Sequence, residues 1–152
     1  SVPQDHAVII GYGRVGRIIG QALAEQNLPY VAIEKSWRLV ETLHEQGVPV
    51  IFGDAAARGV LEAAHVNRAR LLIVATPEGF QVRRILELAR QLNPYIDTVV
   101  RTHTESELQH LQGLGVGRAL MAERELAYSM AEYALERMQP RDEGSSARHG
   151  AA

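Results

Sequence analysis

The sequence predicts an α/β fold in which helices cover both faces of a parallel sheet. Six short apolar runs alternate along the chain with segments whose apolar residues recur at helical spacing. The apolar runs do not alternate with polar residues, which is typical of strands buried on both faces. Because strand–helix–strand crossovers are right-handed, this order favours a Rossmann-like, doubly wound sheet of six parallel strands in a single domain.

Turn and capping residues mark the bounds of these elements in chain order. Pro29 ends the first helix, Ser36 is expected to cap the second, and Gly47 ends it. Asn93 and Pro94 end the fourth helix, because proline cannot continue it. The expected strands are residues 7–10, 30–33, 48–52, 71–75, 98–101 and 119–121, and the expected helices lie around residues 15–23, 36–43, 60–64, 82–89, 105–112 and 123–138.

The composition indicates a soluble globular domain. Of the 152 residues 46% are hydrophobic and 22% charged, and no apolar stretch approaches the length that spans a bilayer. A membrane role would therefore come from another part of the protein. The absence of cysteine excludes disulfides and thiolate metal sites, and the scattered arginines do not predict a nucleic-acid patch.

Two regions of the chain are expected. Residues 1–138 form the folded domain. Residues 139–152 are polar, contain proline, glycine and serine, and show no periodicity, so we predict a disordered polar tail there.

A glycine-rich motif lies where the first strand meets the first helix. The residues from Gly11 to Gly16 match G-x-G-x-x-G in the position that a phosphate-binding turn requires. Gly11 permits the tight turn, Gly13 lets a phosphate approach the backbone, and Gly16 lets the helix pack closely on the strand. Arg14 stands at the start of the helix, where it either contacts the anion or is a solvated surface residue.

Three further polar residues follow strands at the same edge of the predicted sheet. Glu34 closes the second strand, where a carboxylate accepts hydrogen bonds from both ribose hydroxyls and repels a 2′-phosphate. Asp54 either meets the adenosine or caps the next helix, and Thr76 either contacts the ligand or caps its own helix. The sequence alone leaves both pairs of alternatives open.

Catalytic machinery is not evident. The chain has no room for a substrate domain, and its one lysine, Lys35, does not follow a tyrosine at the spacing used by single-domain dehydrogenases. Of the histidines, His103 lies nearest the predicted crevice, but no histidine pair has metal-ligand spacing, so we expect no metal. A non-enzymatic domain is favoured, and a small NAD-dependent oxidoreductase or a methyltransferase-like enzyme is the alternative.

Four segments together resemble the TrkA-N domain, the N-terminal half of the regulator of potassium conductance (RCK) module. Within this family the chain is most similar to the C-terminal cytoplasmic domain of Kef-type antiporters and their YbaL relatives. The resemblance covers roughly residues 5–138. Its segments are residues 6–16, Gly53-Asp54-Ala55, residues 99–103 and residues 121–127.

The resemblance implies a cytoplasmic domain of a bacterial inner-membrane protein that gates a potassium or other monovalent cation:proton antiporter. It implies binding of an adenine nucleotide, AMP or NAD(H), a homodimer, and a membrane transport domain in the same polypeptide. Leu126, Met130, Ala134, Leu135 and Met138 of the final helix are the expected dimer surface, or pack in part on their own sheet. The expected nucleotide-binding residues are Gly11, Tyr12, Gly13, Arg14, Val15, Gly16, Glu34, Lys35, Gly53, Asp54, Ala55, Ala75, Thr76 and Arg101.

Overall fold

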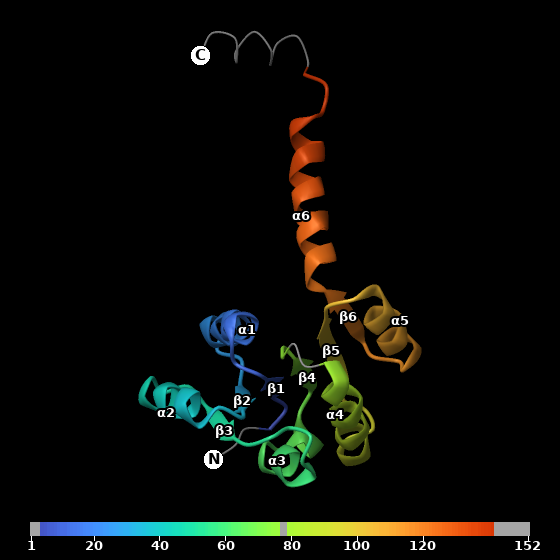
Figure 1. Cartoon of the computed structure of the whole chain (residues 1–152). Coiled ribbons are helices and arrows are strands. Elements are labelled where there is room, and N and C mark those ends of the chain that lie inside the picture. Colours follow the sequence, from blue (N-terminus) through green and yellow to red (C-terminus); the bar gives the residue numbers. More distant parts are fainter. Residues whose placement is uncertain (1–3, 77–78, 142–152) are drawn as a thin grey trace. The chain divides into compact units, whose positions relative to one another are not determined.

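The computed structural model describes residues 4–76 and 79–141 (Figure 1). Most of the predicted tail, residues 142–152, lies outside the described residues. The strands are β1 (Ala7–Ile10), β2 (Tyr30–Glu34), β3 (Val50–Phe52), β4 (Leu71–Val74), β5 (Asp97–Thr102) and β6 (Arg118–Met121). The helices are α1 (Arg14–Glu25), α2 (Trp37–Glu45), α3 (Arg58–Ala63), α4 (Gly79–Leu92), α5 (Glu105–Gly113), α6 (Ala122–Arg137) and the 3₁₀ turn η1 (Val66–Arg68).

All six strands pair in parallel in the order β3-β2-β1-β4-β5-β6. This confirms the predicted doubly wound sheet. Ala7 of β1 pairs with Tyr30 of β2 on one side and with Leu71 of β4 on the other. From β1 the chain adds β2 and β3 on one side of the sheet and then β4, β5 and β6 on the other, so the topological switch point lies between β1 and β4. In open α/β sheets, ligands bind at this point, in the crevice outside the carboxyl ends of the strands.

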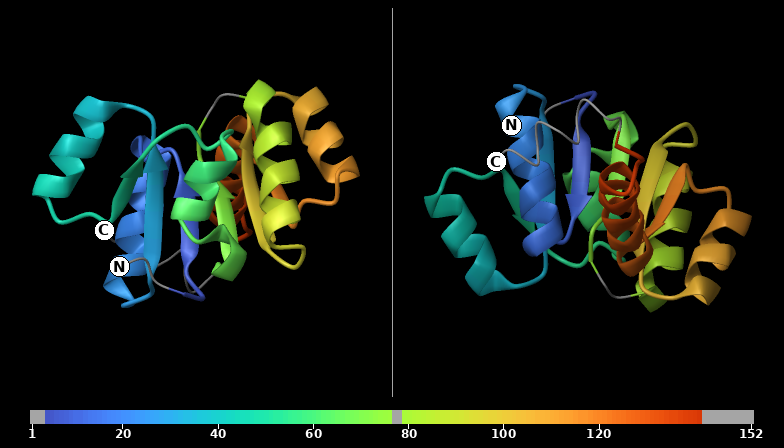
Figure 2. Two further views of the ribbon diagram at one scale, coloured as in Figure 1. Left: turned by 90° about the horizontal axis from the view of Figure 1, so that it is seen from below. Right: turned by 90° about the horizontal axis from the view of Figure 1, so that it is seen from above.

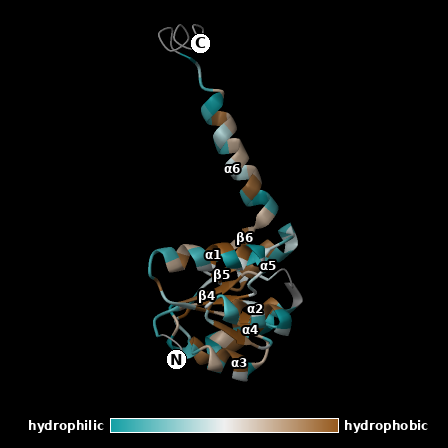
Figure 3. Cartoon of the chain, turned by 90° about the vertical axis from the view of Figure 1, so that its left-hand side faces the viewer, coloured by the Kyte–Doolittle hydropathy of each residue, from teal (hydrophilic) through white to brown (hydrophobic). Residues whose placement is uncertain are grey.

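The strands divide the core into two layers. Val8 and Ile10 pack with residues of α3, α4 and α5, whereas Ala7 and Ile9 pack with residues of α1 and α2. This alternation is the ordinary two-residue period of a strand. The strands are correspondingly the most hydrophobic part of the ribbon in Figure 3, and Figure 2 shows helices on both faces of the sheet.

Several element bounds differ from those predicted by a few residues, among them these three. β3 begins at Val50 instead of residue 48, because the Val48 N–H donates to the Leu43 carbonyl at 2.9 Å and closes the end of α2. β5 is longer than expected and reaches Asp97 and Thr102. The short 3₁₀ turn η1 was not predicted, and it follows His65, a residue with a positive φ of 53°.

Contacts within the chain divide it into two compact units, residues 1–121 and residues 122–152. The first unit contains the whole sheet. In the second, α6 has no buried residue, so its apolar side chains are all exposed. The predicted domain limit at residue 138 remains a prediction. Within the described residues, no helix combines the length and apolar character needed to cross a bilayer.

Candidate functional site

The turn after β1 is shaped by two close approaches of the backbone. Gly11 has a positive φ of 86°, and a Cβ there would lie 3.1 Å from the Thr76 Cβ. A Cβ on Gly16 would lie 2.1 Å from the Gly11 carbonyl oxygen. Both positions therefore require glycine, as the motif predicted. Gly13 differs, because a Cβ there would meet nothing within 4 Å.

The N-terminus of α1 opens beside this turn. Its first intrahelical bond runs from the Arg17 N–H to the Gly13 carbonyl at 3.0 Å, so the N–H groups of residues 14–16 have no acceptor within the helix. No side chain caps this helix, and its first turn contains no acidic residue. These amides and the partial positive charge of the helix end favour an anion.

At the end of β2 the backbone holds the Glu34 carboxylate in place. One carboxylate oxygen accepts the Tyr12 N–H at 2.9 Å, and the other accepts the N–H groups of Lys35 at 3.1 Å and Ser36 at 3.2 Å. The Tyr12 bond joins the glycine turn directly to the acid that was predicted to bind ribose. Because a carboxylate has about four lone-pair sites, Glu34 retains capacity for a ligand hydroxyl.

The Tyr12 ring lies beneath the turn and not in the crevice. Its side chain is 2% exposed, and its hydroxyl lies 3.1 Å from the Tyr30 hydroxyl at the start of β2. A Cβ on Gly20 would collide with this ring, so glycine in α1 makes room for it. Burial, and then the hydrogen bond with Tyr30, raise the pKa of the Tyr12 hydroxyl above its usual range. Tyr12 thus anchors the turn to α1 and β2.

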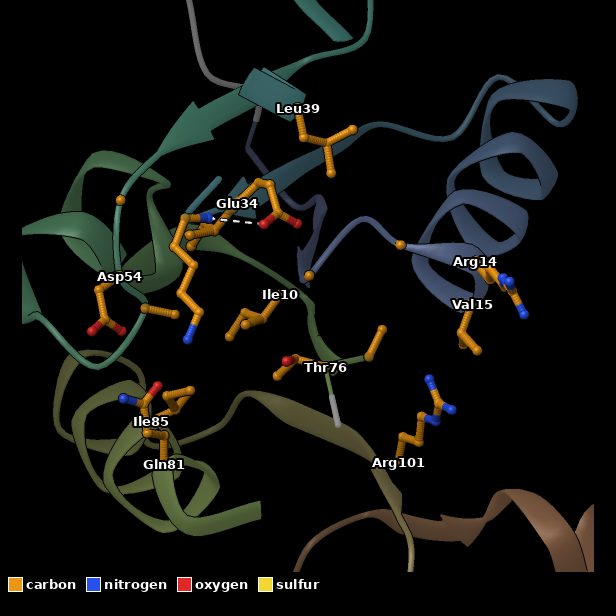
Figure 4. Close-up of a pocket in the computed structure, with 17 residues that line it drawn as sticks. Ile10, Arg14, Val15, Glu34, Leu39, Asp54, Thr76, Gln81, Ile85 and Arg101 are labelled. Atoms are coloured by element: carbon orange, nitrogen blue, oxygen red, sulfur yellow. Dashed lines mark hydrogen bonds between the residues drawn. The ribbon is translucent and has the colours of Figure 1, made fainter. Parts of the chain in front are cut away.

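These elements surround a cavity of about 520 Å³ at the carboxyl edge of the sheet (Figure 4). The volume falls within the range of about 300–1,000 Å³ typical of small-molecule sites. The cavity is lined by Ile10, Gly11, Gly13, Arg14, Val15, Ile33, Glu34, Lys35, Leu39, Gly53, Asp54, Ala55, Ala75, Thr76, Gln81, Ile85 and Arg101.

All but two of the expected nucleotide-binding residues line this cavity. The exceptions are Tyr12 and Gly16, which support the turn from below. Asp54 lines the cavity and accepts the Ala56 N–H at 2.9 Å, whereas α3 is capped by Ala57, so the helix-cap alternative for Asp54 was wrong. Thr76 also lines the cavity, while residues 77–78 between it and α4 lie outside the described residues.

Five lining residues were not predicted. Ile10 and Ile33 immediately precede Gly11 and Glu34, so the strand ends could have indicated them. The other three are Leu39 of α2 and Gln81 and Ile85 of α4. Helix packing brings these residues to the cavity, and nothing in the sequence distinguishes their positions from those of other helix residues.

Charge is distributed unevenly along the cavity. Glu34 and Asp54 lie over β2 and β3, at one end. Arg14 and Arg101 lie at the other end, where Figure 4 shows the Arg101 side chain extending from β5 toward the first turn of α1. The Arg101 Nε atom is buried without a hydrogen-bond partner among the described residues. The cavity therefore has one end with two carboxylates and Lys35, and another end with two arginines.

Among the described residues, no histidine lines this cavity. His103 follows β5 as predicted but is not among the lining residues, and its backbone N–H donates to the Glu107 carboxylate at 3.0 Å. Among the described residues no group of three or more histidine, aspartate or glutamate side chains is placed to hold a metal ion.

Comparison with known proteins identifies close relatives of this chain. Residues 7–122 match the model of the TrkA-N domain family. The putative cation/proton antiporter YbaL of Escherichia coli is 37% identical over 135 residues, which is 87% of this chain and 24% of YbaL. The chain thus spans about a quarter of that relative's length.

Solved structures give the same assignment. The TrkA-N domain of the E. coli inner membrane protein YbaL superposes with a TM-score of 0.81 at 36% identity, covering 86% of this chain and 97% of that domain. The Kef C-terminal domain of Shewanella denitrificans, solved in an AMP-bound form, gives a TM-score of 0.75 at 26% identity, covering 96% and 87% of the two chains.

Proposed function

Because the chain belongs to the TrkA-N domain family, we propose that it is a regulatory domain that binds an adenine nucleotide and so gates a potassium or other monovalent cation:proton antiporter. The observation that carries this proposal is the cavity itself. It joins the uncapped N-terminus of α1 to a carboxylate held by three backbone N–H groups. The first suits a phosphate, and the second suits a ribose with both hydroxyls free.

AMP and NAD(H) are the ligands proposed for this cavity. AMP is supported by the Shewanella Kef domain, which was solved with AMP and is 26% identical. Glu34 disfavours NADPH, because a 2′-phosphate would bring negative charge against a carboxylate that the backbone holds in place. No metal is needed in this proposal, since backbone amides and arginines supply the positive field.

Regulation and not catalysis is proposed for this site. Among the described residues that line the cavity none is a histidine, tyrosine or cysteine, and the ionisable groups there are Glu34, Asp54, Lys35 and two arginines. Glu34 already accepts three backbone N–H groups, which suits it to binding a hydroxyl better than to moving a proton.

The partners proposed are a second copy of the chain and a membrane transport domain in the same polypeptide, so that this chain is a cytoplasmic domain of an inner-membrane protein. The similarity to antiporters four times as long supports the second partner. The apolar side chains of α6 support the first, since Leu126, Met130, Leu135 and Met138 are each more than 60% exposed. Sedimentation that gives only monomer over micromolar concentrations would contradict the dimer.

Gating follows from differential affinity. A nucleotide shifts the antiporter between two states only if it binds this domain more tightly in one of them. The proposed ligand would contact β1, β2 and β5, the loops that follow β3 and β4, and helices α1, α2 and α4 at once, so the difference in affinity can arise among these elements. A small change in their relative positions would change the fit.

Calorimetric titration tests the proposal. The purified chain is titrated with AMP, NAD, NADH and NADPH, alongside Glu34→Ala and a control, Glu41→Ala, which replaces an exposed glutamate of α2 outside the cavity. We expect Glu34→Ala to weaken binding by about 10- to 100-fold, the value of one or two hydrogen bonds to a charged group. Glu41→Ala should bind like the wild type. Absence of binding by every nucleotide would overturn the proposal.

A further inference from the structure

We propose that the hydrogen bond from His6 to Ala64 is an acid-sensitive contact, which holds the end of α3 against β1 only while the His6 ring is neutral, and through which protons weaken nucleotide binding. The effect on the nucleotide rests on the proposed function, whereas the acid sensitivity of the contact does not. His6 lies just before β1, at the amino edge of the sheet, and is not among the residues that line the cavity.

The hydrogen bond shows which ring nitrogen of His6 carries the hydrogen. The His6 side chain is 1% exposed, and its Nε2 atom lies 2.8 Å from the carbonyl oxygen of Ala64, the C-cap residue of α3. Because a carbonyl can only accept, Nε2 carries the hydrogen, and in the neutral ring Nδ1 has none. Nδ1 is buried without a hydrogen-bond partner among the described residues. A proton on Nδ1 would thus bury both a charge and an unsatisfied N–H, which is unfavourable.

The surroundings of His6 offer no compensation for that charge. The charged or titratable side chains on the neighbouring segments of the same core layer are Asp5, Arg58, Glu62, His65, Arg68 and Arg70. Both carboxylates in this set are already paired with arginines, Asp5 with Arg70 and Glu62 with Arg58. The buried Nδ1 of His65 also lacks a partner, so it does not accept a hydrogen bond from His6.

Two side chains fasten the segment from α3 to β4 at this edge. Asn93 donates from its side-chain amide to the carbonyls of Val66 at 3.0 Å and Ala69 at 2.9 Å, and these bonds do not depend on protonation. His6 holds the preceding residue pair, Ala64 and His65, through the Ala64 carbonyl. Acid should therefore release the end of α3 first, while Asn93 still holds η1.

Helix α3 connects this contact to the cavity. The segment Gly53-Asp54-Ala55 lines the cavity and lies just before α3. Ala55, Leu61 and Ala64 belong to one core cluster, so release of Ala64 would loosen the packing that positions this segment. A proton at His6 and a nucleotide in the cavity would then favour different states, and each would lower the affinity for the other.

Unfolding of the ligand-free chain tests the contact. Urea denaturation at pH 8 and pH 5.5 compares the wild type with His6→Gln, whose side-chain amide can still donate to Ala64 but takes up no proton. An unfolded histidine takes up its proton near pH 6.5, so exclusion of that proton from the folded state raises the equilibrium constant for unfolding by about 10-fold at pH 5.5. We expect the wild type to show an additional loss of this size relative to His6→Gln. His110→Gln replaces an exposed histidine of α5 and, as the control, should retain the full acid sensitivity.

Nitrogen NMR of the histidine rings tests the same contact in the wild-type protein. The His6 ring should carry its hydrogen on Nε2 at pH 8 and should remain neutral at pH 5.5 in the molecules that stay folded. A hydrogen on Nδ1 at pH 8 would overturn the proposal. Equal acid sensitivity of the wild type and His6→Gln in urea would overturn it as well.

Calorimetry with AMP at the same two pH values tests the effect on the nucleotide. The phosphate of AMP also titrates near pH 6, so the wild type and His6→Gln are compared at each pH. Between pH 8 and pH 5.5 we expect the affinity of the wild type to fall about 5-fold further than that of His6→Gln. An equal fall would overturn the coupling and leave the proposed function intact. Absence of AMP binding to both proteins at pH 8 would count against the proposed function itself, and the unfolding experiment would still decide the acid sensitivity of the contact.

Discussion

At the β2 end of the cavity the Glu34 carboxylate accepts three backbone N–H groups, whereas at the β5 end the Arg101 Nε is buried with no acceptor among the described residues. The first end is complete without a ligand. The second has donors and positive charge that a ligand would satisfy. The difference indicates that changes at the β2 end affect stability and binding together, while changes at the β5 end separate them.

The largest effect is expected at the turn between the two ends. Gly16→Ala places a methyl group against the Gly11 carbonyl, and we expect the free energy of unfolding to fall by about 3 kcal/mol or more. Gly13→Ala meets no neighbouring atom, so its stability should change by less than about 1 kcal/mol while nucleotide binding weakens about 10-fold or more. Urea denaturation followed by circular dichroism, together with calorimetry, measures both. Equal stability of Gly16→Ala and the wild type would contradict this account of the turn.

The next largest effect is expected at the hydrogen-bonded hydroxyl groups of Tyr12 and Tyr30, which lie beneath the glycine turn. Tyr12→Phe leaves the buried Tyr30 hydroxyl without its partner and should cost about 1–2 kcal/mol. The double variant Tyr12→Phe/Tyr30→Phe leaves no hydroxyl unsatisfied and should recover part of that loss. A double variant with the summed loss of both single variants would show that the hydroxyl pair is not coupled.

The same hydroxyl predicts a dependence on alkaline pH. Because folding raises the pKa of Tyr12, its contribution to stability is present below the unfolded value of about 10 and is lost as the pH rises above it. Unfolding at pH 8 and pH 11 should therefore show a larger loss for the wild type than for the double phenylalanine variant. Equal losses would mean that other groups control alkaline unfolding.

A smaller effect of opposite sign is expected at the β5 end. Arg101→Met removes an unpaired buried donor and a positive charge near Arg14, so the ligand-free protein should gain about 0.5–1 kcal/mol. Arg84→Met is the control and should change nothing. With a saturating nucleotide that contacts Arg101 the gain should shrink or reverse, because the wild type would bind that ligand more tightly than the variant. A loss of stability in the ligand-free Arg101→Met protein would remove the contrast between the two ends.

The smallest effect belongs to an ion pair at the opposite edge of the sheet. Arg70 donates to both carboxylate oxygens of Asp5, and this hydrogen bond lowers the pKa of Asp5 below its usual 3.8. The contribution to stability is thus present above that pH and is lost as the pH falls below it. Both side chains are exposed, so Asp5→Asn should shift the melting temperature by at most about 1–2 °C at pH 7 and by less at pH 2. A larger shift at pH 7 would show that this edge is more tightly coupled to the core than its exposure suggests.

Local sequence patterns predicted much of the fold and of the site. The strands and the glycine turn could be predicted because short-range patterns, the apolar runs and the G-x-G-x-x-G motif, specify them. The cap at Ser36 and the position of Glu34 could be predicted because their side chains accept hydrogen bonds from backbone groups within three residues. The start of β3 was misplaced because Val48 serves the end of α2, a local competition between helix closure and strand pairing that the residue types do not decide.

The sequence by itself determined that a glycine-rich turn follows the first strand and that an acid closes the second, because both depend on residues adjacent in the chain. Only the tertiary structure decided that the Tyr12 ring turns under α1 toward Tyr30, and that Leu39, Gln81 and Ile85 reach the cavity. It alone placed Arg101 opposite Arg14, 87 positions away in the chain. Parallel strand pairing brings such distant strand ends to one edge of the sheet, and helix packing then selects which side chains face the space between them.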